Sequence, residues 1–328
     1  MVPEGPPDLR SDGIVLTPRH FVVFNPASGR GRGARRIALY TRLLRQAIED
    51  VTFGVTTGPG EEAQLADRAI AEGYDVIVAV GGDGTWSNVA DRIVASGRRE
   101  IALAILPSGT GNDFGRNFGF DPKSPEEVVG VLADGHTQFV DVGFVETPSA
   151  SEHTPERMET RHFLNLIGFG FDIAVIDAAA SARFLRGELL YKVTALQQLF
   201  RFPGIGVDLA SGMGEKRRSH QLMLTVSNGR YFGGGFPIAP AATVEDGQLH
   251  ACMIADASPL TRLKLFNLAE RGRHVSSDRV EIINDSSFRL TFAEPPRFEV
   301  DGDVRRSSDA TIDVRVLPEA LRVVAPRP

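Results

Sequence analysis

The chain has 328 residues, a length that favours two domains over one. Hydrophobic residues make up 42% of it and charged residues 24%, which is typical of a soluble globular protein with a buried core. The net charge of -6 argues against nucleic acid as the main partner. Cys252 is the only cysteine, which excludes a disulfide framework or a Cys-based metal site and indicates a reducing compartment.

The N-terminal segment has no apolar stretch of the signal-peptide type, and no apolar run reaches about 18 residues. We therefore expect a cytoplasmic protein without a membrane span.

The first part of the chain alternates strand patterns with helix patterns. Strands are predicted at His20–Asn25, Val51–Thr56, Asp75–Val80 and Ile101–Leu106, and helices at Ala34–Ile48, Glu61–Glu72, Asn88–Ala95 and Pro125–Ala133. This alternation is typical of parallel βαβ units, in which ligands bind beyond the carboxyl ends of the strands. Three glycine-rich turns fall at those ends.

The first of these turns, Asn25–Gly33, contains the pattern G-x-G-x-G. Its spacing is too short for a dinucleotide fingerprint, and the chain has neither a P-loop nor the protein-kinase motifs. Backbone N–H groups together with Ser28, Arg30 and Arg32 suit a phosphate. A solvated basic loop is the alternative.

The second turn is Gly81-Gly82-Asp83-Gly84-Thr85, and the third is Pro107–Asp113. Glycines let the backbone approach an anion, and free N–H groups at a helix start favour negative charge. Each turn also carries a Thr and an Asp. Two such turns at neighbouring strand ends can surround one nucleotide and its metal with donors, hydroxyls and carboxylates.

The pattern changes after about residue 138. Short strands are predicted at Gln138–Val145, His162–Ile167, Gly206–Leu209, Gln221–Ser227, Gln248–Ile254, Arg279–Ile283, Ser287–Phe292 and Arg297–Val300. Helices are predicted at Phe184–Phe200 and Pro259–Arg271, a loop at Thr147–Arg161, and two tail strands within Ala310–Val324. We expect an α/β domain at 14–138, with 306–328 as a candidate completion, and a β-rich domain, a sandwich or a curved double sheet, at 139–305.

The motifs occur in an ordered series. Asn25–Gly29 reads NPxSG, followed by GGDGT and by PxGTGNDF at Pro107–Phe114. Asn165–Asp172, a GGG…P-A…E-D-G block from Phe232 to Gly247, and Val300–Asp303 follow in the second half. This series covers roughly residues 20–305 and resembles the soluble diacylglycerol kinase and sphingosine kinase family, in particular its bacterial diacylglycerol-kinase-like members. The resemblance implies an N-terminal nucleotide domain, a C-terminal β-sandwich that holds lipid, and an active site in the cleft between them.

The resemblance also implies roles for single residues. The implied nucleotide contacts are Asn25, Ser28, Gly29, Arg30, Thr57 (or Thr56), Gly81, Gly82, Asp83, Gly84, Thr85, Ser108, Thr110, Asn112 and Asp113. Asp303 takes the position of the family's proton acceptor, and Asp83 is placed near the nucleotide–metal complex, so these two are the predicted catalytic residues. Thr243, Asp246 and the carbonyl of Gln248 fall where bacterial members hold a structural Mg²⁺.

Other assignments rest on the residues themselves. Asp172 lies beside a glycine turn and is a candidate contact for a lipid head group, with a plain strand-end turn as the alternative. The helix Phe184–Phe200 has an apolar stripe flanked by basic residues, and we expect the stripe to face the core rather than a bilayer. Two positions depart from the family pattern: Asn88 replaces a Glu but can still cap a helix, and Asp303 replaces a longer Glu.

The expected function is transfer of the γ-phosphoryl group of ATP, with Mg²⁺, to a lipid hydroxyl at the membrane surface. Diacylglycerol is the favoured acceptor, and a sphingoid base or another lipid alcohol is the alternative. NAD kinase shares the GGDGT turn but is not expected to carry the GGG…P-A block. A non-catalytic nucleotide or lipid sensor is the alternative from another class, and a homodimer stays open.

Overall fold

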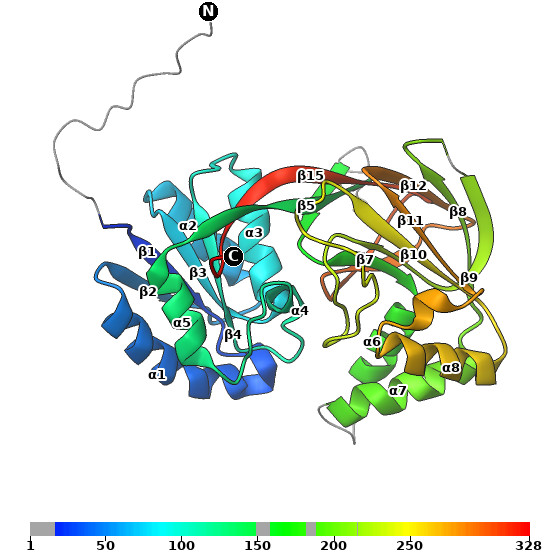
Figure 1. Ribbon diagram of the computed structural model, residues 1–328, viewed down its shortest axis with the longest axis horizontal. Helices are drawn as coiled ribbons and strands as arrows, with labels where there is room; N and C mark the ends of the chain where they lie inside the picture. The colour runs from blue at the N-terminus through cyan, green and yellow to red at the C-terminus, as the bar shows by residue number, and fades with distance from the viewer. Residues whose placement is uncertain (1–16, 149–157, 182–187, 215) are drawn as a thin grey trace, which may run out of the picture.

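The computed structural model describes residues 17–148, 158–181, 188–214 and 216–328. Figure 1 shows two bodies side by side, with the first part of the chain in one and the middle of the chain in the other. Two long strands, drawn in green and red, pass from one body to the other along the same edge. Among the described residues, no helix is both long and apolar enough to cross a membrane.

The first domain is an α/β layer structure. Its strands are β1 (His20–Phe24), β2 (Val51–Val55), β3 (Val76–Gly81) and β4 (Ala102–Pro107), parallel and in the order β2-β1-β3-β4. Its helices are α1 (Ser28–Ala47), α2 (Glu61–Ala71), α3 (Asp83–Ala95), the short α4 (Asp113–Arg116) and α5 (Pro125–Asp134). The pair α1 and α5 and the pair α2 and α3 pack on opposite faces of the sheet (Figure 1). Because both faces are covered, the central strands are continuous apolar runs rather than alternating ones.

The strand order places a topological switch between β1 and β3. The chain leaves β1 towards β2 on one side, then returns to add β3 on the other side. The connecting helices therefore diverge at the carboxyl ends of β1 and β3. In open α/β sheets, the ligand-binding crevice is found at such a switch point, and "the crevice" below refers to this end of the sheet.

The second domain is mainly antiparallel. Its strands are β5 (Thr137–Pro148), β6 (Met158–Phe163), β7 (Leu166–Gly170), β8 (Ile205–Ser211), β9 (Lys216–Ser227), β10 (Leu249–Ala255), β11 (Val280–Asp285), β12 (Ser287–Phe292), β13 (Arg297–Val300) and β14 (Asp303–Arg306). A core that includes Phe163, Leu224 and Phe298 fills the sandwich. The helices α6 (Phe171–Ser181), α7 (Glu188–Arg201) and α8 (Pro259–Ala269) lie together below it (Figure 1).

One strand joins the two domains. β15 (Thr311–Val324) pairs with β12 near its start and with β4 near its end, and runs antiparallel to β5 throughout. Its pairing shifts between Leu317 and Leu321, where Glu319 has φ +50°. The buried Asp141 accepts the Glu319 N–H at 2.8 Å, which fixes this bend. The strands of both domains thus form one continuous hydrogen-bonded sheet.

The α/β domain followed by a β-sandwich confirms the predicted fold class, but several element predictions are wrong. α1 and α3 begin at Ser28 and Asp83, because the glycine turns themselves form the first helical turns. The tail is one bent strand rather than two, and the segment predicted as one strand at His162–Ile167 is split between β6 and β7. The short elements α4, α6 and β14 were not predicted.

The apolar stripe of α7 also differs from expectation. Leu199 is buried, whereas Leu196 and Phe200 are 46% and 53% exposed, so the last turn of this helix does not turn its predicted stripe to the core. Of the other predicted segments, residues 149–157 and 182–187 lie outside the described residues.

Candidate active site

The phosphate-type turns meet at the switch point of the sheet. α3 begins directly after β3, and its N-cap Gly82 supplies no side-chain hydrogen bond to the helix start. α1 likewise begins three residues after Asn25 without a side-chain cap. Two helix N-termini with uncapped backbone N–H groups therefore lie at the ends of adjacent strands, an arrangement suited to an anion.

Asn25 ties the first turn to the second. Its Nδ2 donates to Thr85 Oγ1 at 3.0 Å and to Glu62 Oε1 at 2.8 Å, and its Oδ1 accepts the Ala27 N–H at 3.0 Å. Glu62 is 5% exposed, and its Oε2 has no hydrogen-bond partner among the described residues. The asparagine thus holds two chain segments together and leaves one buried acceptor free at the crevice.

The third turn packs tightly on the second. A Cβ on Gly109 would lie 2.4 Å from Gly82 Cα, so only glycine allows this approach. Asn112, at φ +53°, closes the turn by accepting the Gly109 N–H and donating back to its carbonyl. Ser108 Oγ lies 2.7 Å from Ser28 Oγ, which links the third turn to the start of α1.

Other predicted nucleotide residues are more peripheral. Thr57 is exposed and donates to Glu61, whereas Thr56 is buried. Thr110 is exposed. Gly29 lies at the start of α1 with φ +58°, and the side chain of Arg30 lies outside the described residues.

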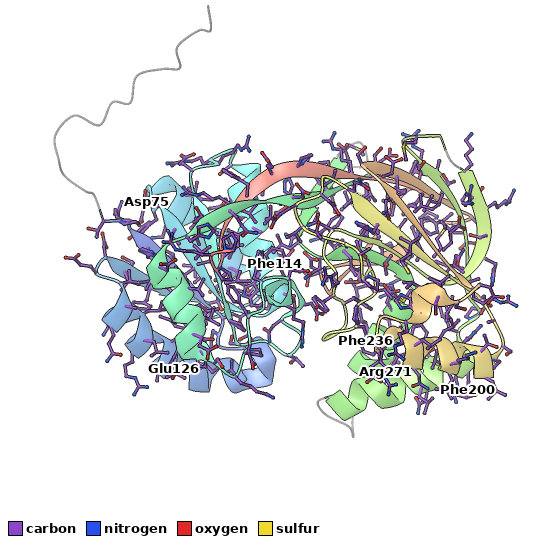
Figure 2. The ribbon with its side chains drawn as sticks, viewed as in Figure 1. Asp75, Phe114, Glu126, Phe200, Phe236 and Arg271 are labelled. Atoms are coloured by element: carbon purple, nitrogen blue, oxygen red, sulfur yellow. The ribbon has the colours of Figure 1, made fainter. Side chains whose placement is uncertain are left out.

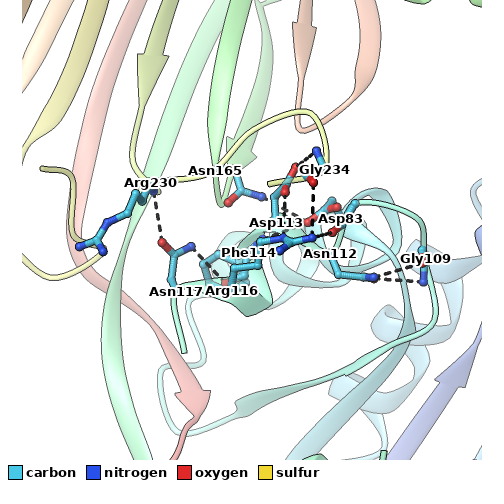
Figure 3. A network of polar contacts seen from close by, with 11 residues as sticks. Asp83, Gly109, Asn112, Asp113, Phe114, Arg116, Asn117, Asn165, Arg230 and Gly234 are labelled. Carbon is cyan, nitrogen blue, oxygen red and sulfur yellow. Dashed lines mark hydrogen bonds and ion pairs between the residues drawn. The ribbon is translucent and has the colours of Figure 1, made fainter. Parts of the chain in front are cut away.

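Two carboxyl groups lie at the centre of the site (Figure 3). Asp83 Oδ1 accepts the Phe114 N–H at 3.0 Å, and Asp113 Oδ2 accepts the Gly234 N–H at 2.8 Å. Burial, followed by repulsion from Asp113, raises the pKa of Asp83 to about 7. The pKa of Asp113 is also raised by burial, although Arg116 opposes the shift. The pair therefore favours a bound cation or proton.

Contacts at this point join the two domains. Asn165 Nδ2 of the second domain reaches Asp83 Oδ1 at 3.5 Å, and Asn117 Oδ1 accepts the Arg230 N–H at 3.2 Å. Arg116 contacts Asp113 and the carbonyl of Gly234 (Figure 3). The GGG segment of the second domain is thus held directly against the third turn of the first domain.

Asp303 lies across from the second turn. Its side chain is exposed at the start of β14, and its Oδ1 is 3.9 Å from the position that a Cβ on Gly84 would take. Both predicted catalytic residues, Asp83 and Asp303, therefore lie at the first turn of α3.

The sequence did not single out Asp301, whose structural role is extensive. Its carboxyl group is 7% exposed and accepts three backbone N–H groups, from Leu164, Asn165 and Leu166, at 2.7 to 3.1 Å. It fastens the turn that carries Asp303 to the start of β7. The only signal was its place in the motif Val300–Asp303.

The predicted metal and lipid residues lie apart from the phosphate turns. Thr243, Asp246 and Gln248 are exposed on the loop before β10, where Asp246 accepts the Gln248 N–H and lies 3.2 Å from His250 Nε2. Asp172 is 4% exposed at the start of α6. Among the described residues, no three His, Cys, Asp or Glu side chains converge on one metal position.

Asn88 does not cap a helix, because α3 begins five residues earlier. Its Oδ1 instead accepts a hydrogen bond from Arg161 of β6 at 2.5 Å. Arg161 also pairs with Asp91 at 3.3 Å. The neutral side chain at this position therefore belongs to a polar contact between α3 and the second domain.

Comparison with known proteins assigns the two domains to a class. Residues 19–145 match the diacylglycerol kinase catalytic domain, and residues 165–325 match the YegS C-terminal NAD kinase beta sandwich-like domain. The chain is 28% identical to a diacylglycerol kinase of Mycobacterium tuberculosis (strain ATCC 25618 / H37Rv) over 92% of this chain and 94% of that protein. It is 22% identical to a diacylglycerol kinase of Bacillus subtilis (strain 168) over 86% of this chain and 88% of that protein.

The fold is likewise similar to a solved structure of a diacylglycerol kinase from Bacillus anthracis str. Sterne. The TM-score is 0.69 at 19% identity, with 95% of this chain and 98% of that chain covered. The two matched domains define an ATP-dependent kinase that transfers phosphate to an alcohol. The chain belongs to the diacylglycerol-kinase-like family of lipid kinases.

Proposed function

We propose that this enzyme transfers the γ-phosphoryl group of ATP to the primary hydroxyl of diacylglycerol, with Asp303 as the general base. The observation that carries this proposal is the position of Asp303 Oδ1. It lies 3.9 Å from the point that a Cβ atom would occupy if Gly84, in the first turn of α3, carried a side chain. A carboxylate there lies next to backbone donors suited to phosphates and is exposed enough to receive a substrate hydroxyl.

The site fits a nucleotide with its metal. The close approach of Gly82 and Gly109 leaves bare backbone at the crevice, and buried acceptors such as Glu62 Oε2 and Asn165 Oδ1 lack partners among the described residues. Mg²⁺ takes one or two carboxylates together with phosphate oxygens, and Asp83 and Asp113 would hold it here. When bound, the ion would neutralise charge on the transferring phosphoryl group.

Asp303 then has a defined task. Its carboxylate accepts the proton of the lipid hydroxyl as that oxygen attacks the γ-phosphorus and the bond from the γ-phosphorus to the bridging oxygen of ADP breaks. ADP leaves, and the exposure of Asp303 lets it return the proton to solvent. A positioned base of this kind contributes about 10²–10⁴-fold to the rate. Aspartate in place of glutamate is compatible with this task because the Asp301–Gly302 turn brings it close to α3.

We further propose that α7 and α8 face the lipid surface. Leu260 is 76% exposed and borders a hollow of about 510 Å³. The charged residues that line this hollow are three bases and one acid: Lys264, Arg271, Arg273 and Glu270. Phe200 and Arg271 lie on this same side of the second domain (Figure 2). Exposed apolar side chains with basic neighbours suit an anionic bilayer, although the whole chain has a net charge of -6.

A structural Mg²⁺ is proposed at the loop before β10. Thr243, Asp246 and the carbonyl of Gln248 offer only oxygen donors, as Mg²⁺ prefers. This ion would hold the loop and takes no part in transfer.

The function is tested by transfer of labelled γ-phosphate from ATP with Mg²⁺ into lipids in mixed micelles. The panel contains diacylglycerol, monoacylglycerol, ceramide, sphingosine and phosphatidylglycerol, with NAD as a soluble control. We expect label in diacylglycerol, and its loss in Asp303→Asn.

Other outcomes separate the alternatives. Label in sphingosine or ceramide alone would replace diacylglycerol with another lipid alcohol. Binding of ATP without label in any acceptor would favour the non-catalytic sensor.

A further inference from the structure

Two buried carboxyl side chains lie behind the Asp303 turn. Asp172 belongs to the first turn of α6, and Glu299 lies on β13 directly opposite Gly168 of β7. A Cβ on Gly168 would lie 2.1 Å from Asp172 Oδ2 and 3.0 Å from Glu299 Oε1. The missing side chain of Gly168 therefore makes the space that both carboxyl groups occupy.

The pair is almost completely shielded from water. Asp172 is 4% exposed and Glu299 0%. Within the described residues, neither oxygen of Asp172 nor Glu299 Oε1 makes a hydrogen bond of ordinary geometry. Burial raises the pKa of Asp172 to about 7. Burial, and then the charge of Asp172, raises the pKa of Glu299 well above its usual range. Two such groups side by side hold a proton at neutral pH.

The other oxygen of Glu299 contacts the backbone of the catalytic turn. Glu299 Oε2 accepts the N–H of Gly302 at 2.5 Å. Asp301 and Gly302 both have positive φ, +47° and +90°, so the turn has an uncommon conformation that needs outside contacts to persist. Asp303 follows immediately, and its carboxyl group points to the first turn of α3.

We propose that Glu299, paired with Asp172 over Gly168, is a positioning residue that holds Asp303 against the first turn of α3. This inference rests on the proposed function, in which Asp303 is the base. Glu299 Oε2 accepts the Gly302 N–H, and Glu299 Oε1 faces Asp172 across the space left by Gly168, so one side chain connects the buried pair to the turn. Small displacements of a reacting group cost large factors in rate, so a rigid turn matters for transfer.

The charges around the pair are mostly negative. β7 contributes none, because Leu166–Gly170 is uncharged. The surrounding charged groups are Asp301 and Asp303 in the turn, Arg297 of β13 with its partner Asp177 of α6, and Arg305 of β14. Because Arg297 is engaged by Asp177, repulsion among the acids keeps the proton on the pair.

The first test reads the position of residue 303 without catalysis. Gly84→Cys with Asp303→Cys places two thiols at the predicted contact, and Cys252, the only native cysteine, is buried. Mild oxidation is followed by thiol counting and by mass spectrometry. We expect the double-cysteine protein to form the disulfide readily when residue 299 is the native Glu. Glu299→Gln should behave in the same way, because its amide oxygen still accepts the Gly302 N–H. Glu299→Ala should form the disulfide about tenfold more slowly.

The second test measures kcat and KM on the otherwise native chain. Glu299→Ala is expected to lower kcat by about 10- to 100-fold with KM for ATP unchanged, and Glu299→Gln to restore it to within about threefold. Asp172→Asn should shift the pH profile of kcat in the range near pH 7. Asp208→Asn is the matched control, because Asp208 is an exposed acid of the same domain that pairs with Arg218 and does not contact the turn, and it should leave all values unchanged.

The two tests separate this inference from the proposed function. Equal cross-linking rates for Glu299→Ala and the parent would overturn the positioning role, even where Asp303→Asn is inactive. Slow cross-linking in the Glu299→Ala variant would support the positioning role. If Asp303→Asn were active at the same time, Asp303 would be removed as the base.

Discussion

The first domain presents mainly backbone N–H groups to the site, together with Asp83 and Asp113, whereas the second domain presents Asp303 on a turn that other carboxyl side chains hold. On the first side, uncapped helix starts and the Gly82–Gly109 contact expose N–H groups at the crevice. On the second side, Asp301 accepts three N–H groups and Glu299 accepts a fourth, so that Asp303 is held in place. In the proposed mechanism, phosphate binding therefore depends on chain geometry, and activation of the acceptor depends on individual side chains.

This difference predicts that the largest loss of activity follows substitution of a side chain in the second domain. Asp303→Asn keeps the shape of the side chain but cannot take a proton, so we expect kcat to fall by about 10²–10⁴-fold. ATP binding should be unchanged, because the phosphate-type turns are intact. Steady-state kinetics on lipid micelles and fluorescence of Trp86, the only tryptophan, measure the two quantities separately.

Asp208→Asn is the control for this substitution, since Asp208 is an exposed acid of the same domain on β8. Phosphoryl transfer to lipid at the parent rate by Asp303→Asn would mean that the second domain does not supply the base. The proposed difference between the two domains would then be wrong.

The first side should instead be sensitive to the addition of a single methyl group. Gly109→Ala would put a Cβ 2.4 Å from Gly82 Cα, so the two turns must separate. Overpacking of this kind costs about 1–3 kcal/mol of stability. Because the turns also define the crevice, we expect ATP affinity to fall by about tenfold or more, as measured by Trp86 fluorescence titration.

Gly130→Ala is the matched control, because Gly130 lies within α5 and an added Cβ meets nothing within 4 Å. There the same change should stabilise the protein by about 0.5–1 kcal/mol. If Gly109→Ala behaved like this control, backbone contact would not define the nucleotide site.

The two sides also differ in how far the sequence predicted them. The first side was predictable because each strand is an apolar run that ends in a glycine turn, and parallel strands bring such turns to one edge. The starts of α1 and α3 were misplaced, since the glycine turns proved to be their first turns, and the short helix α4 was not predicted. Asp303 was predicted from the motif resemblance, and its role stays a prediction.

Glu299 and Asp172 were not predicted as a pair. They meet only because β13 aligns with β7 at Gly168, and strand register between distant segments is not encoded in local periodicity. Asn88 was misassigned for a related reason: its partner Arg161 lies on β6 of the other domain. Local sequence patterns thus predict the contacts of the first domain at the site well and those of the second domain poorly.

A pH measurement examines the place where the first domain also depends on carboxyl groups, the pair Asp83 and Asp113. The pKa of Asp83 is raised to about 7, so the folded protein binds a proton there between about pH 4 and 7 that the unfolded chain does not. This contribution stabilises the folded state at low pH and is lost as pH rises to 7. In the proposed site, binding of ATP with Mg²⁺ should have the opposite dependence, because the ion needs the carboxylate.

We therefore expect affinity for ATP with Mg²⁺ to rise by about tenfold from pH 6 to pH 8. Asp113→Asn removes the repulsion on Asp83 and should move this rise to lower pH. Titration by calorimetry at each pH measures the effect, and an unchanged midpoint in Asp113→Asn would show that the two acids do not interact.

The smallest effect is expected where a side chain on the first side only supports the backbone. Ser28 Oγ lies 2.7 Å from Ser108 Oγ, a neutral hydrogen bond between the start of α1 and the third turn. Ser28→Ala should cost about 1 kcal/mol of stability and lower ATP affinity only a few-fold, because the N–H groups of both turns remain. Thermal unfolding and the same fluorescence titration measure this. A loss of ATP affinity as large as that of Gly109→Ala would indicate that Ser28 contacts phosphate directly. The first domain would then depend on single side chains, as the second domain does.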